Sequence, residues 1–204
     1  MKMVFEYEYL KSSLANIGKP AVPIIPFTPT KLVTPKNLLD IRSSWKGIES
    51  ILADIIQRFD LDTKRCLEFG VEFGYSTAAL SSFFDEVIGV DIFTGDMHTG
   101  VRRDIYQETQ DRLKDFKNIR LVRSDYRDWI KSDNSRYDLT HVDIIHTYTH
   151  TFECGLWAAN HSKCVIFHDT ESFRAVKLAV AEICRRTGKT FYNYTDSYGL
   201  GIIV

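Results

Sequence analysis

Short apolar runs alternate with segments of helical periodicity over most of the chain. Seven runs have the length and composition of strands, at 65–69, 86–91, 119–123, 137–142, 164–168, 189–194 and 200–204. Apolar residues at helical spacing predict helices over 41–56, 76–84, 102–116, 149–159 and 173–187. This alternation indicates an α/β fold, in which helices cover both faces of a mostly parallel sheet. Because only a short turn at residues 197–199 joins the last two strands, we expect them to be antiparallel to each other.

The prolines are confined to one stretch ahead of this pattern. All five lie between residues 20 and 35, at Pro20, Pro23, Pro26, Pro29 and Pro35. Proline lacks a backbone donor and fixes φ, so this stretch is excluded from central strands and helix interiors. We therefore expect a Pro-rich N-terminal arm or cap over residues 1–44 and a single domain over residues 45–204.

Composition narrows the class of protein. With 204 residues, 44% of them hydrophobic and 26% charged, the chain is typical of a globular protein. A net charge of −1 shows no excess of basic residues such as a general nucleic-acid binder carries, so nucleic acid is not an expected partner. This does not exclude a local basic pocket. No run approaches the roughly 20 apolar residues that span a bilayer, and the N-terminus lacks a signal-peptide pattern, so no membrane partner is expected. Scattered cysteines favour a reduced, cytoplasmic protein, at Cys66, Cys154, Cys164 and Cys184.

The most informative segment follows the first strand of the domain and opens a helix. It reads E-x-G-x-x-x-G from Glu68 through Gly70 to Gly74. Glycines at this place in a doubly wound sheet let the backbone approach a nucleotide-like ligand closely. Dinucleotide folds use G-x-G-x-x-G for a pyrophosphate, whereas an acid ahead of the first glycine favours a cationic ligand. The alternative is an ordinary glycine turn between strand and helix.

Two further acids end the next two predicted strands. Asp91 lies 21 positions after Gly70, where an acid accepts both hydroxyls of a ribose. Asp125 ends the following strand at the same edge and suits an adenine amino group, although it could equally cap a helix. Together with the glycine loop, these acids indicate an adenosine-containing ligand.

At this point the sequence resembles the class I S-adenosylmethionine-dependent methyltransferases, over about residues 45–204. Within them it is most similar to the small-molecule O-methyltransferases that include macrolide-sugar O-methyltransferases. Residues 66–76 match the first family motif, 87–91 the ribose-binding strand, 137–143 and 166–170 the fourth and fifth strand ends, and 198–203 the last strand. The resemblance implies a Rossmann-like, seven-stranded sheet of order 3-2-1-4-5-7-6 with the last strand antiparallel. It also implies S-adenosylmethionine as cofactor, held by Glu68, Gly70, Gly74, Ser76, Asp91, Asp125 and Asp143.

Candidate catalytic groups gather after the fourth and fifth strands of the domain: Asp143, His146 and His168, with Asp169 beside them. In one interpretation Asp143 and Asp169 hold Mg²⁺, which lowers the pKa of a bound hydroxyl. In the other, His146 alone is the general base. The family pattern D-x-D-H-x-Y has its second acid replaced by Ile145 here, so dependence on a metal stays open.

These residues predict a methyltransferase that acts on a hydroxyl of a small-molecule substrate, a sugar or natural product. Two alternatives stay open: a hydroxylase of secondary metabolites with the same fold, and a non-catalytic S-adenosylmethionine-binding module. The acceptor carries no readable motif. The Pro-rich arm leaves a homo-oligomer open as well.

Overall fold

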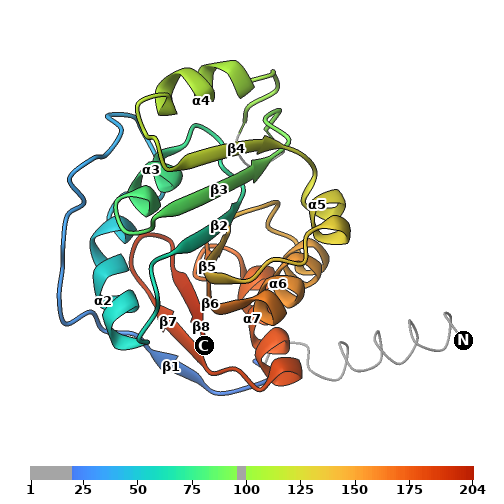
Figure 1. Cartoon of the computed structure of the whole chain (residues 1–204). Helices are drawn as coiled ribbons and strands as arrows, with labels where there is room; N and C mark the ends of the chain where they lie inside the picture. The colour runs from blue at the N-terminus through green and yellow to red at the C-terminus, as the bar shows by residue number, and fades with distance from the viewer. Residues whose placement is uncertain (1–19, 96–99) are drawn as a thin grey trace, which may run out of the picture.

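The computed structural model describes residues 20–95 and 100–204 (Figure 1). The first 19 residues of the expected arm lie outside the described part. Within that part, a single sheet forms the centre of the molecule, with helices on its two faces (Figure 1). None of the described helices is long and apolar enough to cross a membrane. The four cysteines are free and buried, as expected of reduced thiols.

The sheet has eight strands in the order β1-β7-β8-β6-β5-β2-β3-β4. Their bounds are Ile24–Pro26 for β1, Arg65–Phe69 for β2, Glu86–Asp91 for β3, Ile119–Arg123 for β4, Tyr137–Val142 for β5, Ser162–His168 for β6, Phe191–Tyr194 for β7 and Leu200–Ile203 for β8. The seven strands from β2 to β8 have the predicted order. Strand β8 is antiparallel to both of its neighbours, β6 and β7, whereas the other pairs are parallel. The Rossmann-like prediction is therefore confirmed.

The expectation of seven strands is wrong by one. Strand β1 comes from the Pro-rich stretch and pairs in parallel with β7, with Ile24 opposite Phe191. Proline is tolerated there because β1 lies at the edge of the sheet, where one side of the strand needs no donors. The next residue, Phe27, is buried and packs beneath the sheet. Part of residues 1–44 is thus built into the sheet itself.

The helices lie close to their predicted positions, with two corrections. They comprise the 3-10 helix η1 (Ile48–Ile51), α2 (Leu52–Arg58), α3 (Tyr75–Ser81), α4 (Tyr106–Leu113), α5 (Tyr126–Ser132), α6 (Tyr148–His161) and α7 (Arg174–Thr187). The helix predicted from residue 41 begins only at Ile48, because Gly47 has a φ of 104° that a helix cannot contain. Helix α5, of seven residues, was not predicted.

Alternating residues of each central strand serve two apolar cores. Leu67 and Phe69 of β2 pack with α6 and α7 on one face, whereas Cys66 packs with η1 and α2 on the other. Figure 1 shows α2 and α3 on one side of the sheet and α5, α6 and α7 on the other. Because both faces are covered, the carboxyl ends of the parallel strands are left as the place where side chains can meet a ligand.

Candidate active site

The glycine loop lies against the end of the neighbouring strand. Gly70 has a φ of 89°, and a Cβ there would lie 1.7 Å from the backbone oxygen of Asp143. No other residue fits that approach. Gly74 has a φ of 86°, precedes α3 and packs against Leu113. Gly74 does not line the cavity of this site. A glycine is needed there for the turn and for packing against Leu113, and not for the predicted contact with a ligand.

Glu68 has a different role from the one predicted. Its side chain is fully buried and does not line the cavity. Its two carboxylate oxygens accept hydrogen bonds from the hydroxyls of Ser76 and Thr77, each at 2.5 Å, and Glu68 Oε1 lies 2.9 Å from His141 Nδ1. The predicted direct contact between Glu68 and a ligand is therefore wrong: the carboxylate supports the first turn of α3 from below. Ser76 itself lines the cavity.

Asp91 ends β3 and organises the loops around it. Its Oδ2 accepts hydrogen bonds from the backbone N–H groups of Val71 (2.8 Å) and Glu72 (2.9 Å), and its Oδ1 accepts one from Phe93 (2.6 Å). Burial raises the pKa of this carboxyl, and the three backbone N–H groups oppose that rise without cancelling it. Asp91 lines the cavity, at the position expected of a ribose ligand.

Asp125 caps a helix, which is one of its two predicted roles. It is the N-cap of α5, where its Oδ1 accepts a hydrogen bond from the backbone N–H of Arg127 at 2.8 Å. The same residue lines the cavity next to Ser124 and Tyr126. The capping interpretation is confirmed, and the contact with an adenine stays a prediction.

The predicted catalytic residues come together in one cluster, which we call the cavity cluster: Asp143, His146, His168 and Asp169. His146 Nε2 lies 3.2 Å from Asp143 Oδ1 and 3.1 Å from Asp169 Oδ2. His168 Nδ1 lies 3.1 Å from Asp143 Oδ2 and 3.3 Å from Asp169 Oδ2. Each imidazole thus bridges the same two carboxylates, although the four residues come from the ends of two different strands.

The charges of the cavity cluster depend on one another. Burial alone would raise the pKa of the Asp143 carboxyl, but the charge of His168 and hydrogen bonds from both histidines outweigh it and hold this pKa well below its usual range. Burial would also raise the pKa of Asp169, but hydrogen bonds from His146 and His168 lower this pKa to about 2. Against burial, the two carboxylates raise the pKa of His146 to about 9 and that of His168 to about 10.

Packing fixes the orientation of both imidazoles. The ring of His146 stacks on that of Phe173, with centroids 4.3 Å apart and an interplanar angle of 21°. His168 Nε2 donates to the backbone oxygen of Ser197 at 3.2 Å, so its Nδ1, which faces the carboxylates, is the nitrogen left for them. Asp169 holds a φ of 65°, a strained conformation for a residue with a side chain. Such strain is typical of functional sites.

Three members of the cavity cluster meet the geometry of a metal site. One ligand atom from each of Asp143, His146 and Asp169 lies within 4.8 Å of the others. Two carboxylates and one imidazole suit a divalent cation, with the carboxylate oxygens matching the preference of Mg²⁺ or Mn²⁺. The candidate ligand set therefore needs no acid at position 145.

A single cavity of about 600 Å³ joins these parts. Its walls come from the glycine loop (Gly70 and Val71), from Asp91 and Asp125 at the strand ends, and from the cavity cluster. This volume lies within the range of small-ligand sites, which is about 300–1,000 Å³. Five of the seven predicted cofactor residues, all but Glu68 and Gly74, therefore line the same space as the predicted catalytic residues.

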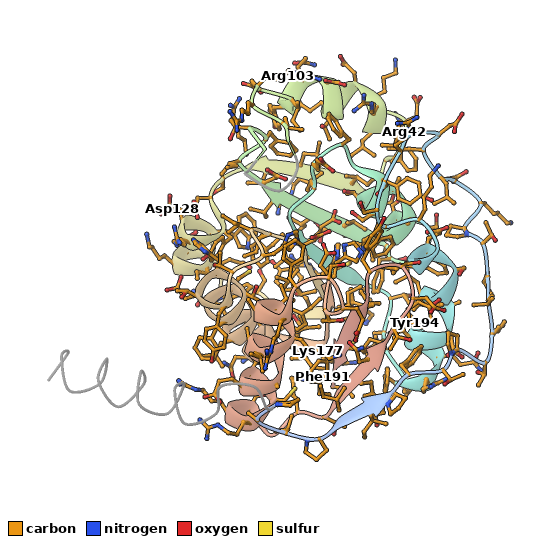
Figure 2. The ribbon with its side chains drawn as sticks, turned by 180° about the vertical axis from the view of Figure 1, so that it is seen from behind. Arg42, Arg103, Asp128, Lys177, Phe191 and Tyr194 are labelled. Atoms are coloured by element: carbon orange, nitrogen blue, oxygen red, sulfur yellow. The ribbon has the colours of Figure 1, made fainter. Side chains whose placement is uncertain are left out.

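Sequence reasoning missed two parts of this cavity. Residues 41–45 form one wall, and Arg42 projects from this segment at the surface (Figure 2). Trp45 was assigned to a helix by its spacing, so its indole N–H was not considered. Tyr198, which lines the cavity with 57% of its surface exposed, has a φ of 68° in the β7–β8 turn. The turn at residues 197–199 was predicted, but nothing in the sequence indicates that Tyr198 faces the cavity.

Comparisons with known proteins agree with this geometry. A family model described as "Methyltransferase domain" matches residues 67–170, about half of the chain. Similar solved structures include the methyltransferase domain of a bacterial CtHen1 (14% identity, TM-score 0.57, 79% of this chain and 100% of that chain). A second is the O-methyltransferase from Bacillus cereus in complex with SAH (14% identity, TM-score 0.54, 81% of this chain and 82% of that chain). A third is the O-methyltransferase TomG from Streptomyces achromogenes in complex with SAM (14% identity, TM-score 0.54, 77% of this chain and 78% of that chain). At these identities the structures show a shared fold. No curated protein matches the sequence.

Proposed function

This chain belongs to the methyltransferase-domain family, and from that premise we propose that it transfers the methyl group of S-adenosylmethionine to a hydroxyl of a small molecule, a sugar or natural product. One observation carries the proposal: the loop and acids suited to an adenosine cofactor share one cavity with two carboxylates and two imidazoles. A net charge of −1 favours a small acceptor over a polyanion. TomG, a structure of similar fold, is described as an O-methyltransferase of tomaymycin synthesis.

The residues present fit S-adenosylmethionine. The absence of a Cβ at Gly70 lets the glycine loop lie against the end of β5, where it lines the cavity, while Asp91 and Asp125 lie at the strand ends suited to the ribose and the adenine. Asp91 already accepts three backbone hydrogen bonds, and a carboxylate has about four acceptor positions, so it retains room for a ribose hydroxyl. Ser76 and Asp143 line the same cavity.

The residues present also fit a divalent cation. Asp143, His146 and Asp169 would hold it, since their ligand atoms converge and two of the three are carboxylates. Its charge would lower the pKa of a coordinated acceptor hydroxyl. It would also oppose protonation of His146, which the two carboxylates favour strongly on their own. We therefore favour Mg²⁺ or Mn²⁺ at this place over a site without a metal.

The cofactor, when bound, supplies an electrophilic methyl group on a sulfonium that leaves as a neutral thioether. The protein must then hold the acceptor oxygen in line and take up its proton. Asp143 lies between the two imidazoles and orients both. In a site that holds a cation, His146 would be one of its ligands and the proton of the acceptor hydroxyl would pass to water. In a site without a cation, the neutral form of His146 accepts that proton. His168 donates through Nε2 to Ser197 and faces the carboxylates with Nδ1, so its role is to place Asp143 and Asp169. The cluster thus combines a base with the groups that position it.

The test is to titrate the protein with S-adenosylmethionine in a calorimeter, and then to search for methylated products by mass spectrometry among sugars, glycosides and phenols. We expect binding of one cofactor per chain and a product heavier by one methyl group. Asp91→Ala should weaken cofactor binding about tenfold or more, because it removes the ribose acceptor and loosens the glycine loop. No detectable binding by the wild-type protein would refute the cofactor assignment, and a product heavier by one oxygen would identify a hydroxylase.

A further inference from the structure

Behind the glycine loop lies a second polar cluster, which we call the sealed network: Trp45, Glu68, Ser76, Thr77 and His141. All five side chains are buried, none exposing more than 7% of its surface. They come from four separate parts of the chain, namely the segment before η1, strand β2, the start of α3 and strand β5.

The hydrogen bond from Trp45 fixes the tautomer of His141. Trp45 Nε1 donates to His141 Nε2 at 3.1 Å, and the two rings meet edge to face with centroids 5.2 Å apart. An indole N–H is only a donor, so His141 Nε2 must be the unprotonated nitrogen that accepts. The remaining proton of the neutral ring then lies on Nδ1, which faces Glu68 Oε1 at 2.9 Å and donates to it.

This direction of donation completes the environment of Glu68. Its carboxylate accepts from His141 Nδ1–H, from the Ser76 hydroxyl and from the Thr77 hydroxyl. Ser76 and Thr77 are the second and third residues of α3, which begins directly after the glycine loop. Without the Trp45 donor, the His141 ring can turn its lone pair toward Glu68, and two acceptors would then face each other in a buried site at a considerable free-energy cost.

We propose that Trp45 is a positioning residue for the cofactor site: by holding His141 in the Nδ1–H tautomer, it fixes Glu68 and, through Ser76 and Thr77, the start of α3 beneath the glycine loop. This inference rests on the proposed function, because it takes S-adenosylmethionine as the ligand of the loop. Trp45 also lines the cavity together with residues 41–44. The Trp45 indole is therefore part of both the cavity wall and the sealed network that supports the glycine loop.

The tautomer is measured on the wild-type protein with ¹⁵N-labelled histidine by NMR. We expect His141 to carry its proton on Nδ1 only, and the Trp45 indole N–H to shift when S-adenosylhomocysteine is added. A proton on His141 Nε2 would overturn the proposal. So would an indole resonance that is unchanged at saturating S-adenosylhomocysteine. Neither measurement needs a variant, so both hold even where substitutions reduce folding.

The variant Trp45→Phe keeps most of the ring and removes the donor. We expect it to weaken S-adenosylmethionine binding about five- to tenfold and to shift the ¹⁵N resonance of His141 Nε2, because the ring is then held only through Nδ1–H and Glu68. Trp129→Phe is the matched control, since the Trp129 indole nitrogen is buried and has no hydrogen-bond partner among the described residues. It should leave both readouts unchanged.

The outcomes separate this inference from the proposed function. If the wild-type protein binds no S-adenosylmethionine, the proposed function fails, while the tautomer still reports on the network. If the wild-type protein binds it and a folded Trp45→Phe variant binds it equally well, the positioning role is refuted and the proposed function stands. Equal weakening by Trp129→Phe would also refute it, since the effect would then not be specific to the donor.

Discussion

The molecule contains two acid–histidine clusters, and they differ chiefly in where their residues lie relative to the ends of the strands. In the sealed network, Glu68 and His141 lie within β2 and β5 and are fully buried. In the cavity cluster, Asp143 and Asp169 each come one residue after a strand has ended, and both line the cavity. His141 and Asp143 are only two positions apart, yet one is sealed and the other faces the ligand space.

This difference teaches how similar residues acquire different roles. Inside the sheet, packed layers cover both faces, so a polar side chain must find all of its partners within the protein. Past the strand end, the covering helices give way to the cavity, and a side chain can keep some of its bonding capacity for a ligand. The sealed network should therefore govern stability and the shape of the loop, and the cavity cluster should govern turnover.

The largest expected effect is on turnover. Asp143→Asn removes the charge that orients His146 and His168 and a carboxylate oxygen suited to a cation. We expect methyl transfer to fall roughly 10²–10⁴-fold, with cofactor affinity changed much less. The measurement is transfer from radiolabelled S-adenosylmethionine to whichever acceptor the wild-type enzyme methylates. Turnover close to that of the wild-type enzyme would place the chemistry elsewhere.

The second effect is on stability rather than on turnover. Glu68→Ala leaves three buried donors, from Ser76, Thr77 and His141, without their acceptor. We expect the free energy of unfolding to fall by about 3 kcal/mol or more. Urea unfolding checks this, with Asp143→Asn as the comparison, because a carboxylate at the cavity leaves fewer groups unsatisfied. An equal loss in both variants would remove the distinction between the two clusters.

The third effect concerns the cation. Asp169→Asn keeps the size of the side chain but withdraws one of two carboxylate ligands. The concentration of Mg²⁺ or Mn²⁺ needed for half-maximal activity should rise about tenfold or more. Asp128→Asn is the control, since Asp128 is an exposed acid on α5 that pairs with Lys131 (Figure 2). Full activity of the wild-type enzyme in excess chelator would contradict the metal assignment.

The smallest effect is on the pH dependence of stability without a metal. The pKa of His168 is raised from 6.5 to about 10 in the folded protein, so its contribution is fully present below pH 6.5 and is lost as the pH rises through about 10. In chelator, the free energy of unfolding of the wild-type protein should fall more between pH 7 and pH 10 than that of His168→Gln. Urea unfolding at the two pH values measures the difference, and identical losses would show that the imidazole gains nothing from its carboxylates.

The larger part of the fold could be predicted from the sequence, because the local periodicity of apolar residues indicates strands and helices. The order of the seven strands β2–β8 and the meeting of Asp143, His146, His168 and Asp169 follow from where these strands end. Strand β1 escaped prediction, since three residues among prolines show no period and their pairing with β7 is remote in sequence. The role of Glu68 could not be predicted either, because its partner His141 is remote from it in sequence.

The sealed network shows the limit most clearly. Trp45 and His141 are separated by 96 positions, and no spacing rule connects an indole in a predicted helix with a histidine in a predicted strand. Each of these residues looked like ordinary core. Only the three-dimensional arrangement shows which nitrogen of His141 accepts and which donates, and hence that the glycine loop has a buried support.

The most direct test of the central claim is a crystal structure of the protein with S-adenosylhomocysteine. The account predicts that the ribose lies against Asp91 and that the sulfur faces the cavity cluster, with Asp143 and His146 as the nearest ionisable groups. Trp45 and Glu68 should keep their places in the sealed network behind the loop. A ligand bound outside this cavity, or one whose sulfur points away from Asp143 and His146, would contradict the assignment of the chemistry to the cavity cluster.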